Sequence, residues 1–265
     1  MAFDPNKTLY PFLPLALIFA VAPAYLIFNF QSLTSLDLFI LLFCFFLFDN
    51  MGVQIGVHKH LCHRSFGTHT FWRRGLSLLS VLSGQGSPLV WVAVHMGSHH
   101  PHYESEKDIH TPVKGLWFAF LAWYWRCDKS LINMGVAREY MRDKFLVFLH
   151  RHHTLILLFW WVILSLTGGW KLLVLAGLAP AGLSVIMAGF VNSFMHSRGT
   201  ISRLLFQKYQ NHPGDSTYNS LWLGMMTMGL GLHNNHHHEP SRTIYSQRWY
   251  EWDPSRMIIS LIRKE

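Results

Sequence analysis

The stretch GLGLHNNHHHEP, residues 229–240, places four histidines within six positions. On an α-helix, positions i, i+3 and i+4 share one face, so His233, His236 and His237 can present three imidazoles to one point. Neutral imidazole is a good ligand for iron, copper, zinc and nickel. Burying several such rings without polar partners would cost free energy. The stretch therefore predicts a metal site built on a short helix.

The composition of the 265-residue chain is typical of a membrane protein. The chain is 51% hydrophobic and 15% aromatic but only 14% charged, against roughly 25% charged residues in soluble domains. Its formal charge of +8 comes without a basic run, so a membrane surface suits it better than nucleic acid, and no nucleic-acid binding is expected. The three cysteines (Cys44, Cys62 and Cys127) are unpatterned, which argues against a disulfide framework.

Four apolar segments are long enough to cross a bilayer as helices, which takes about 20 residues each. The short loops on one side of this arrangement hold only Lys171 of the 22 lysines and arginines, so both termini are predicted to be cytoplasmic. We therefore predict an all-α, multi-pass integral membrane protein with four transmembrane helices and a cytoplasmic, helical, histidine-rich cap. As a single domain over residues 1–265, it would have spans at about 11–30, 36–57, 144–167 and 172–195 and a cap formed by 58–143 and 197–265.

Two shorter apolar segments lie within the predicted cap. Glycine and proline interrupt residues 75–94, which predicts a pair of buried or interfacial helices rather than a span. Residues 115–125, GLWFAFLAWYW, are predicted to lie at the membrane interface, where tryptophan and tyrosine are enriched.

Three more histidine groups precede the opening stretch, and the predicted topology places all four on the cytoplasmic side. Within one of them, His95 and His99 are four residues apart and share a face of a regular α-helix. Within another, His58 and His63 are five residues apart, about 140° around such a helix, so that on a regular helix they could not both bind one ion but could each reach a different ion of a pair. The three groups are His58, His60 and His63; His95, His99 and His100; and His196 with Asn192 one helical turn before it.

These motifs resemble the histidine boxes of the integral-membrane fatty acyl desaturases, especially the delta-9, stearoyl-CoA desaturase-like branch. GVHKHLCHRSF (56–66) is similar to the first box, VNSFMH (191–196) to the fourth-helix motif and LHNNHHHEP (232–240) to the last box. EKDIHTP (106–112) is similar to the segment that follows the second box in bacterial members. The second box, HMGSHH (95–100), has one residue more than the H-x2-HH of the delta-9 branch, a spacing that the wider superfamily allows.

The resemblance implies a centre of two Fe ions (Fe2+/Fe3+) that uses O2 and two electrons to introduce a cis double bond, expected at delta-9, into a long acyl chain. No catalytic residue is implied beyond the metal centre, Asn192 would act through a bound water, and His238 is not expected to be a ligand. The metal positions carried over are His58, His63, His95, His99, His100, Asn192, His196, His233, His236 and His237.

Residues around the metal are also predicted. Carboxylates usually orient metal-bound imidazoles, and a site at the membrane boundary suits a substrate with a polar head and a long apolar tail. The candidates for these carboxylates are Asp49, Asp108, Asp215 and Glu239. The candidates for residues that line the pocket for the apolar tail are Trp117, Trp123 and Trp222. Asn219 and Trp222 are candidates for residues that support the metal site from the segment before the last box.

The resemblance implies a long-chain acyl-CoA or acyl-lipid substrate and an external electron donor such as a ferredoxin, a rubredoxin or a cytochrome b5-like protein. A bacterial inner membrane is the expected location. The acyl carrier, the double-bond position, the donor and the roles of His60, His102 and His110 stay open.

Two other functions fit parts of the pattern. A di-iron membrane hydroxylase or ketolase acting on a lipid, sterol or carotenoid would use the same ligands, because it also begins with hydrogen abstraction. A histidine-rich metal transporter would place several ionisable residues inside its spans. Here the span interiors hold few, Asp49 being the clearest.

Overall fold

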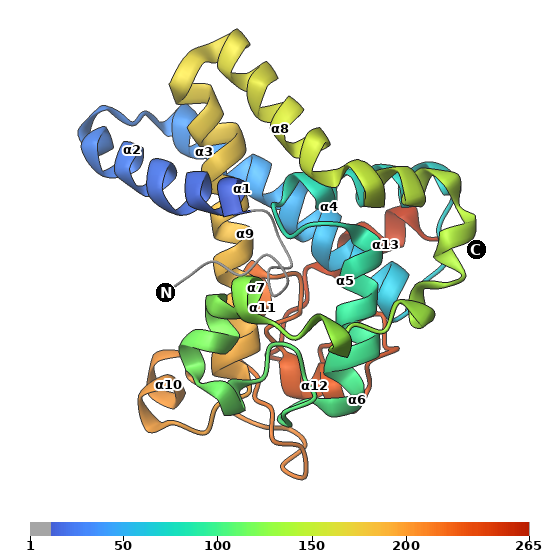
Figure 1. Ribbon diagram of the computed structural model, residues 1–265. Coiled ribbons are helices and arrows are strands. Elements are labelled where there is room, and N and C mark those ends of the chain that lie inside the picture. The colour runs from blue at the N-terminus through green and yellow to red at the C-terminus, as the bar shows by residue number, and fades with distance from the viewer. Residues whose placement is uncertain (1–11, 265) are drawn as a thin grey trace.

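The computed structural model describes residues 12–264, and among them it has helices and loops but no strand (Figure 1). The extended pairings in this part of the chain are isolated bridges, Thr68–Arg263, Tyr209–Asn219 and Asn219–Leu232. The all-helical prediction is therefore confirmed for the described residues.

The helices alternate between α-helical and wider, π-helical winding. The α-helices are α1 (Phe12–Ala16), α2 (Ala22–Phe28), α3 (Ser35–Phe45), α4 (Thr70–Leu82), α5 (Pro88–Val94), α6 (His100–His102), α7 (Trp123–Arg126), α8 (Lys144–Leu173), α9 (Ala179–Phe190), α10 (Thr200–Leu205), α11 (Leu221–Met226), α12 (His233–His238) and α13 (Ser255–Ile262). The π-helical segments are η1 (Leu17–Val21), η3 (Phe46–Cys62), η4 (His95–His99), η6 (Phe118–Ala122), η10 (Val174–Leu178) and η11 (Val191–Met195). Short 3-10 turns are η2 (Phe30–Ser32), η5 (Pro112–Lys114), η7 (Lys129–Leu131), η8 (Met134–Ala137) and η9 (Tyr140–Arg142).

Two continuous helical runs, Ser35–Cys62 and Lys144–Met195, are long and apolar enough to cross a membrane. Inside the second run, Gly168 and Gly169 leave helical geometry, with φ/ψ of −141°/16° and 62°/−160°. The chain reverses at this point: in Figure 1 the yellow part of α8 rises to a tip and then descends into α9. The first predicted span corresponds to a shorter apolar helix, Leu13–Phe28, and its predicted start at Pro11 lies outside the described residues.

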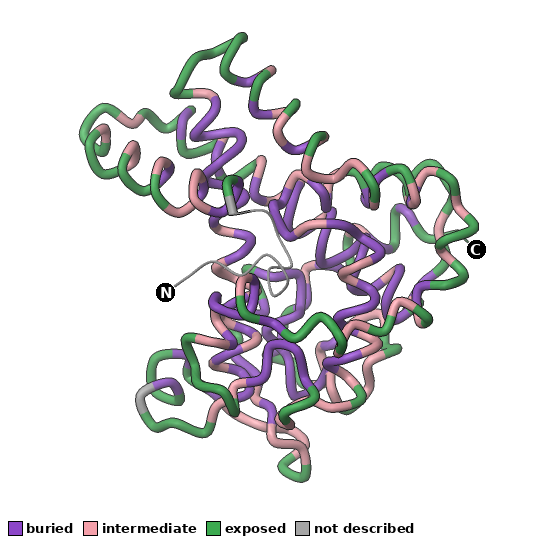
Figure 2. Tube along the Cα trace, viewed as in Figure 1, coloured by how far each residue is buried: buried purple, intermediate pink, exposed green. Residues whose placement is uncertain are grey.

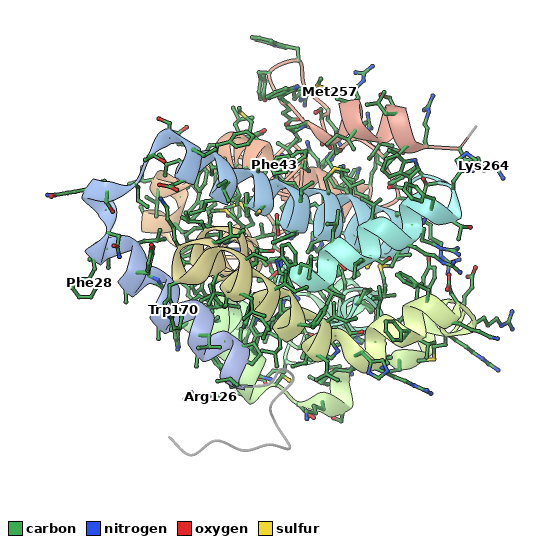
Figure 3. All side chains as sticks on the ribbon, turned by 90° about the horizontal axis from the view of Figure 1, so that it is seen from above. Phe28, Phe43, Arg126, Trp170, Met257 and Lys264 are labelled. Atoms are coloured by element: carbon green, nitrogen blue, oxygen red, sulfur yellow. The ribbon has the colours of Figure 1, made fainter. Side chains whose placement is uncertain are left out.

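Large apolar side chains are exposed on α2, α3 and α8, and Figure 2 shows exposed stretches, in green, along the arms that α2 and α8 form. Figure 3 shows Phe28 and Trp170 near one end of the molecule and Lys264 at the other. A broad exposed apolar surface is uncommon on a protein surrounded by water and suits hydrocarbon. The exposed apolar residues of these helices include Ile27, Phe28, Leu36, Phe39, Leu155, Phe159, Leu166 and Trp170.

Residues 75–94 form two helices, as predicted. A turn in which Gly84 and Gly86 adopt φ of 75° and 88° separates α4 from α5. Helix α4 packs along η3 so closely that a Cβ added to Gly52 would lie 2.4 Å from the backbone nitrogen of Ser80. This contact lets the helix that carries His58 lie against the base of the cap.

Replacing Gly52 by alanine should therefore lower the free energy of unfolding by about 1–3 kcal/mol, because the added methyl group overpacks a backbone-to-backbone contact. Thermal unfolding in detergent measures the effect. Gly75→Ala is the matched control: it adds the same methyl group to α4 where no atom lies within 4 Å. The control should be neutral or raise stability by about 0.5–1 kcal/mol. Equal stability of the two variants would contradict the packing described.

Candidate metal centre

The π-helical winding of η3 aligns its histidines. The backbone N–H of His63 donates to the carbonyl oxygen of His58 at 3.1 Å, an i to i+5 bond. Residues five apart then lie nearly one above the other, and the Nε2 atoms of His58 and His63 are 3.2 Å apart. The prediction that this pair reaches different ions was wrong, because it assumed the 3.6-residue turn of a regular α-helix.

The same winding recurs in η4. The backbone N–H of His100 donates to the carbonyl oxygen of His95, and their Nε2 atoms are 3.1 Å apart. His95 and His99 do have neighbouring rings, with centroids 5.5 Å apart, but their Nε2 atoms belong to different clusters. The extra residue in this box therefore fits a π-helical turn, in which His100 rather than His99 pairs with His95.

Helix α12 divides its histidines between the two clusters. Neighbouring positions on an α-helix point about 100° apart, and the Nε2 of His236 lies near His58 and His100 while that of His237 lies near His99. His99 and His100 are divided in the same way by their own neighbouring positions. Each histidine doublet thus supplies one ring to each cluster, and α12 forms a wall shared by both.

Nine histidines gather into two adjoining groups. In group one, the Nε2 atoms form a closed ring with neighbouring distances of 2.9–3.3 Å, through His58, His63, His95, His100, His236 and back to His58. In group two, the ligand atoms lie within 4.8 Å of one another, with His196–His233 at 2.8 Å and His99–His237 at 3.3 Å; its members are His99, His196, His233 and His237.

These spacings fit metal coordination. Two nitrogens about 2.1 Å from one ion lie roughly 3.0–3.4 Å apart at octahedral or tetrahedral angles. Hydrogen bonding among the rings is a poor alternative, because a neutral imidazole has one donor nitrogen and each Nε2 of group one faces two others. Each group therefore places several imidazole nitrogens around a point where a cation would satisfy them.

The rings are held in the neutral form that metal binding needs. Burial, followed by repulsion from His99 when that ring is protonated and from the charge of Lys59, lowers the pKa of His63 to about 3. Burial likewise lowers the pKa of His95, His236 and His237 well below the ordinary value, and neighbouring histidines lower it further. Neutral imidazole has a free lone pair, so these histidines are ready to bind a cation at neutral pH.

A carboxylate orients one ring of group two. The Nδ1–H of His99 donates to Asp108 at 3.0 Å, and both side chains are buried. Burial raises the pKa of Asp108, but the nearby His110 and His99 lower it by more, so the carboxyl group is ionised. The prediction that Asp108 supports a histidine is confirmed in this contact.

The other predicted supporting carboxylates do not touch a histidine of either group. Asp49 is buried and accepts a hydrogen bond from Ser184 at 2.6 Å. Asp215 accepts from Tyr103, whose ring packs on His237, so its contact is indirect. Glu239 forms an exposed pair with Arg242. The prediction failed for these three because sequence distance from a histidine does not tell which way a side chain points.

Helix α12 is held from behind by a buried amide network. Asn219 accepts the backbone N–H groups of Asn234 and Asn235 at 2.9 and 3.1 Å, and so caps the first turn of the helix from another segment. Asn235 also binds Glu251 at 2.9 Å and the carbonyl oxygen of Tyr245. The supporting role predicted for Asn219 is confirmed. Glu251 was missed, although two asparagines between the histidines indicated that the opposite face of the helix is polar.

Lys59 and Asp253 form a second anchor. Both side chains are fully buried, with Nζ 2.8 Å from Oδ2, and Lys59 lies 3.8 Å from the centre of the Tyr245 ring. That ring packs against His236, with centroids 4.8 Å apart. The ion pair thus fixes the C-terminal segment against the back of group one, and neither partner was predicted.

A cavity adjoins the two groups. Of the tryptophans predicted to line the acyl-chain pocket, Trp123 lines this cavity, whereas Trp117 is 61% exposed and Trp222 stacks on Phe206. Asn192 also lines it, next to group two. Apart from the histidines, the walls combine apolar and amide side chains: Gln54, Gln85, Trp91, Val94, Trp123, Tyr124, Ala188, Val191, Asn192 and Leu230.

The remaining histidines of the motifs have other partners. His60 and His102 bond through Nδ1 to the backbone carbonyls of Phe66 and Ser98. His238 stacks on His212 at 3.6 Å on the outer side of α12 and lies outside both groups. His110 lines the cavity beside His99, and burial lowers its pKa to about 4.

The two histidine groups are compatible with a metal site, and two helical runs are long and apolar enough to cross a membrane. Comparison with known proteins identifies the family. The fatty acid desaturase family model matches residues 34–251, so the chain belongs to that family. Delta-9 desaturase-like 5 protein of Arabidopsis thaliana is 30% identical over 224 residues, which are 83% of this chain and 71% of the relative.

Two cyanobacterial relatives extend the comparison. The sn-2 palmitoyl-lipid 9-desaturase of Nostoc sp. (strain 36) is 28% identical over 84% of this chain and 77% of its own length. The sn-1 stearoyl-lipid 9-desaturase of Anabaena variabilis is 26% identical over 84% and 79%. The chain therefore falls in the delta-9 desaturase-like branch and is an oxidoreductase of the desaturase class.

Asp253→Asn should lower the free energy of unfolding by about 3–5 kcal/mol, because it leaves Lys59 buried without its counter-charge. Chemical or thermal unfolding in detergent measures the change. The comparison variant is Glu239→Gln, which breaks the ion pair with Arg242. The side chains of Glu239 and Arg242 are 45% and 44% exposed. Glu239→Gln should lower the free energy of unfolding by less than about 1 kcal/mol. A small loss in Asp253→Asn would contradict the anchoring role.

His237→Ala and His238→Ala should differ in metal binding although the residues are neighbours. His237 points into group two, so its loss should release a metal ion, whereas His238 lies outside both groups and its loss should release none. Metal content per chain after loading and dialysis is the measurement. Equal metal content in the two variants would show that the groups are not the binding site.

Proposed function

We propose that this chain is a delta-9 fatty acyl desaturase in which two iron ions are held by the nine histidines of groups one and two, with Asn192 acting through a bound water. The observation that carries the proposal is the convergence of these Nε2 atoms into two adjoining, buried groups beside a largely apolar cavity. Iron bound there would supply O2 activation and the removal of two hydrogens from adjacent methylenes.

Residues of the chain would hold the irons, orient the ligands and line the substrate cavity. The neutral imidazoles hold the cations without cancelling their charge, which leaves them strongly attractive to oxygen. Asp108 fixes the orientation of His99 through its Nδ1–H. Trp123, Val94 and Val191 line the cavity with apolar surface beside His95 and His233. An alkyl segment lying there would be held next to both groups and shielded from water.

The substrate would be a long acyl chain on CoA or on a membrane lipid. The names of the Nostoc and Anabaena relatives specify lipid-linked palmitoyl and stearoyl chains and the 9 position. A delta-9 product on an acyl-lipid or acyl-CoA is accordingly expected. The two electrons would come from a separate ferredoxin, rubredoxin or cytochrome b5-like donor.

For the membrane topology, we propose four crossings with both termini in the cytoplasm of a bacterial inner membrane. The exposed apolar arms of α2, α3 and α8 and the reversal at Gly168 and Gly169 support two hairpins. Ser35–Cys62 and Lys144–Met195 supply the apolar length. The histidine groups then lie at the end of the bundle away from those arms.

Expression in a host that lacks its own desaturase should yield acyl chains with a new cis double bond, detected by gas chromatography–mass spectrometry of fatty acid methyl esters. His236→Ala should abolish the product, because His236 belongs to group one and neighbours group two.

The control is His238→Ala, which should retain the activity. A hydroxylated or keto product without a new double bond would instead assign the site to a di-iron hydroxylase or ketolase. Oxygen-independent metal uptake without any change in the acyl chains would favour the transporter.

A further inference from the structure

Two buried polar atoms face each other beside group two without a hydrogen bond. Oε1 of Glu104 and Nδ1 of His196 have no partner and lie 3.7 Å apart. Buried polar atoms in folded proteins are nearly always paired, so an unpaired couple calls for a physical reason. The separation exceeds the usual 2.7–3.2 Å of an N–H···O bond by a distance that a side-chain rotation can close.

The backbone at Glu104 is also unusual. Its φ is 59°, in the left-handed region that glycine adopts freely and glutamate rarely does. Strained residues of this kind persist where the surrounding structure requires their side chain, and they concentrate at functional sites. At Glu104 the strained conformation aims a carboxylate at a histidine of group two. A functional role of the carboxylate would explain why a glutamate occupies a position whose backbone conformation favours glycine.

The carboxylates near the metal groups are unevenly divided between them. Within the described residues, both carboxylates that lie close to a histidine of the two groups belong to group two. Asp108 lies beside His99, and Glu104 lies beside His196. Asp108 and Glu104 belong to the same loop after α6, so a single loop serves two rings of one group.

On the basis of the metal centre proposed above, we propose that Glu104 is a positioning residue for His196. It accepts the Nδ1–H of His196 when the Nε2 of that ring holds a metal ion. A proton kept on Nδ1 leaves the lone pair on Nε2, so the carboxylate selects the tautomer that binds. The two metal positions are then unequal, because group two has two nearby carboxylates, and its ion is the more tightly held.

Stepwise cobalt(II) titration of the metal-free protein in detergent, followed by visible absorption, tests this directly. Wild type should bind in two steps of different affinity. Glu104→Ala should weaken the tighter step by about 10- to 100-fold and leave the other unchanged, which is the usual effect of losing such a partner. Glu104→Gln should lose less, because its amide oxygen still accepts a hydrogen bond.

Two further variants separate positioning from folding and from charge. Glu104→Gly removes the carboxylate but relieves the backbone, so it should weaken cobalt binding as much as Glu104→Ala while the metal-free protein unfolds at or above the wild-type temperature. Glu106→Gln removes one exposed negative charge from the same loop and should bind cobalt as wild type does.

The inference is overturned if Glu104→Ala binds cobalt as wild type does, or if Glu106→Gln loses as much affinity. A weaker step in Glu104→Ala that Glu104→Gly restores would also overturn it, since strain alone would then be the cause. If wild type itself binds no cobalt, the metal centre is wrong and this inference falls with it. Normal binding by wild type and by Glu104→Ala together would overturn this inference only.

Discussion

The close approach of nine imidazole nitrogens is the constraint on which the rest of the structure depends. Their lone pairs face one another at about 3 Å in a buried space, where burial keeps the rings neutral. Such an arrangement is unfavourable unless a cation occupies the centre. The fold must therefore hold four separate segments in place against their mutual repulsion. The buried ion pair of Lys59 with Asp253 and the amide network behind α12 do this, and the two meet at Tyr245.

Helix winding decides which histidine belongs to which group. The wider turns of η3 and η4 direct side chains five residues apart toward the same point, as with His58 and His63. The regular turns of α12 instead pair His233 with His237 in group two. The same chain thus uses two helical periods. In each histidine doublet, the two neighbouring side chains point to different groups. Of the π-helical segments, η3 and η11 form the C-terminal ends of the two long apolar runs, and each leads directly into a histidine of the groups, His63 and His196.

Much of this could be predicted from the sequence. Apolar segments of sufficient length predict the helices, and the i, i+3 and i+4 spacing predicts α12. The prediction that His233, His236 and His237 point to one place was wrong for His236, which lies in group one. The division of ligands could not be predicted, because the π-helical turn of η3 follows from tertiary packing rather than from local propensity. Asp108 was predicted, whereas Glu104, Glu251 and Asp253 were missed, since their contacts join segments far apart in the chain. Asp49, predicted to support a histidine, binds Ser184 instead.

X-ray absorption spectroscopy of the iron-loaded protein, with its iron content, tests whether the nine histidines hold two irons. We expect two irons per chain, each with a first shell dominated by nitrogen at about 2.0–2.2 Å and with the outer-shell scattering of several imidazole rings. A first shell dominated by carboxylate oxygen, or a single iron per chain, would contradict this expectation.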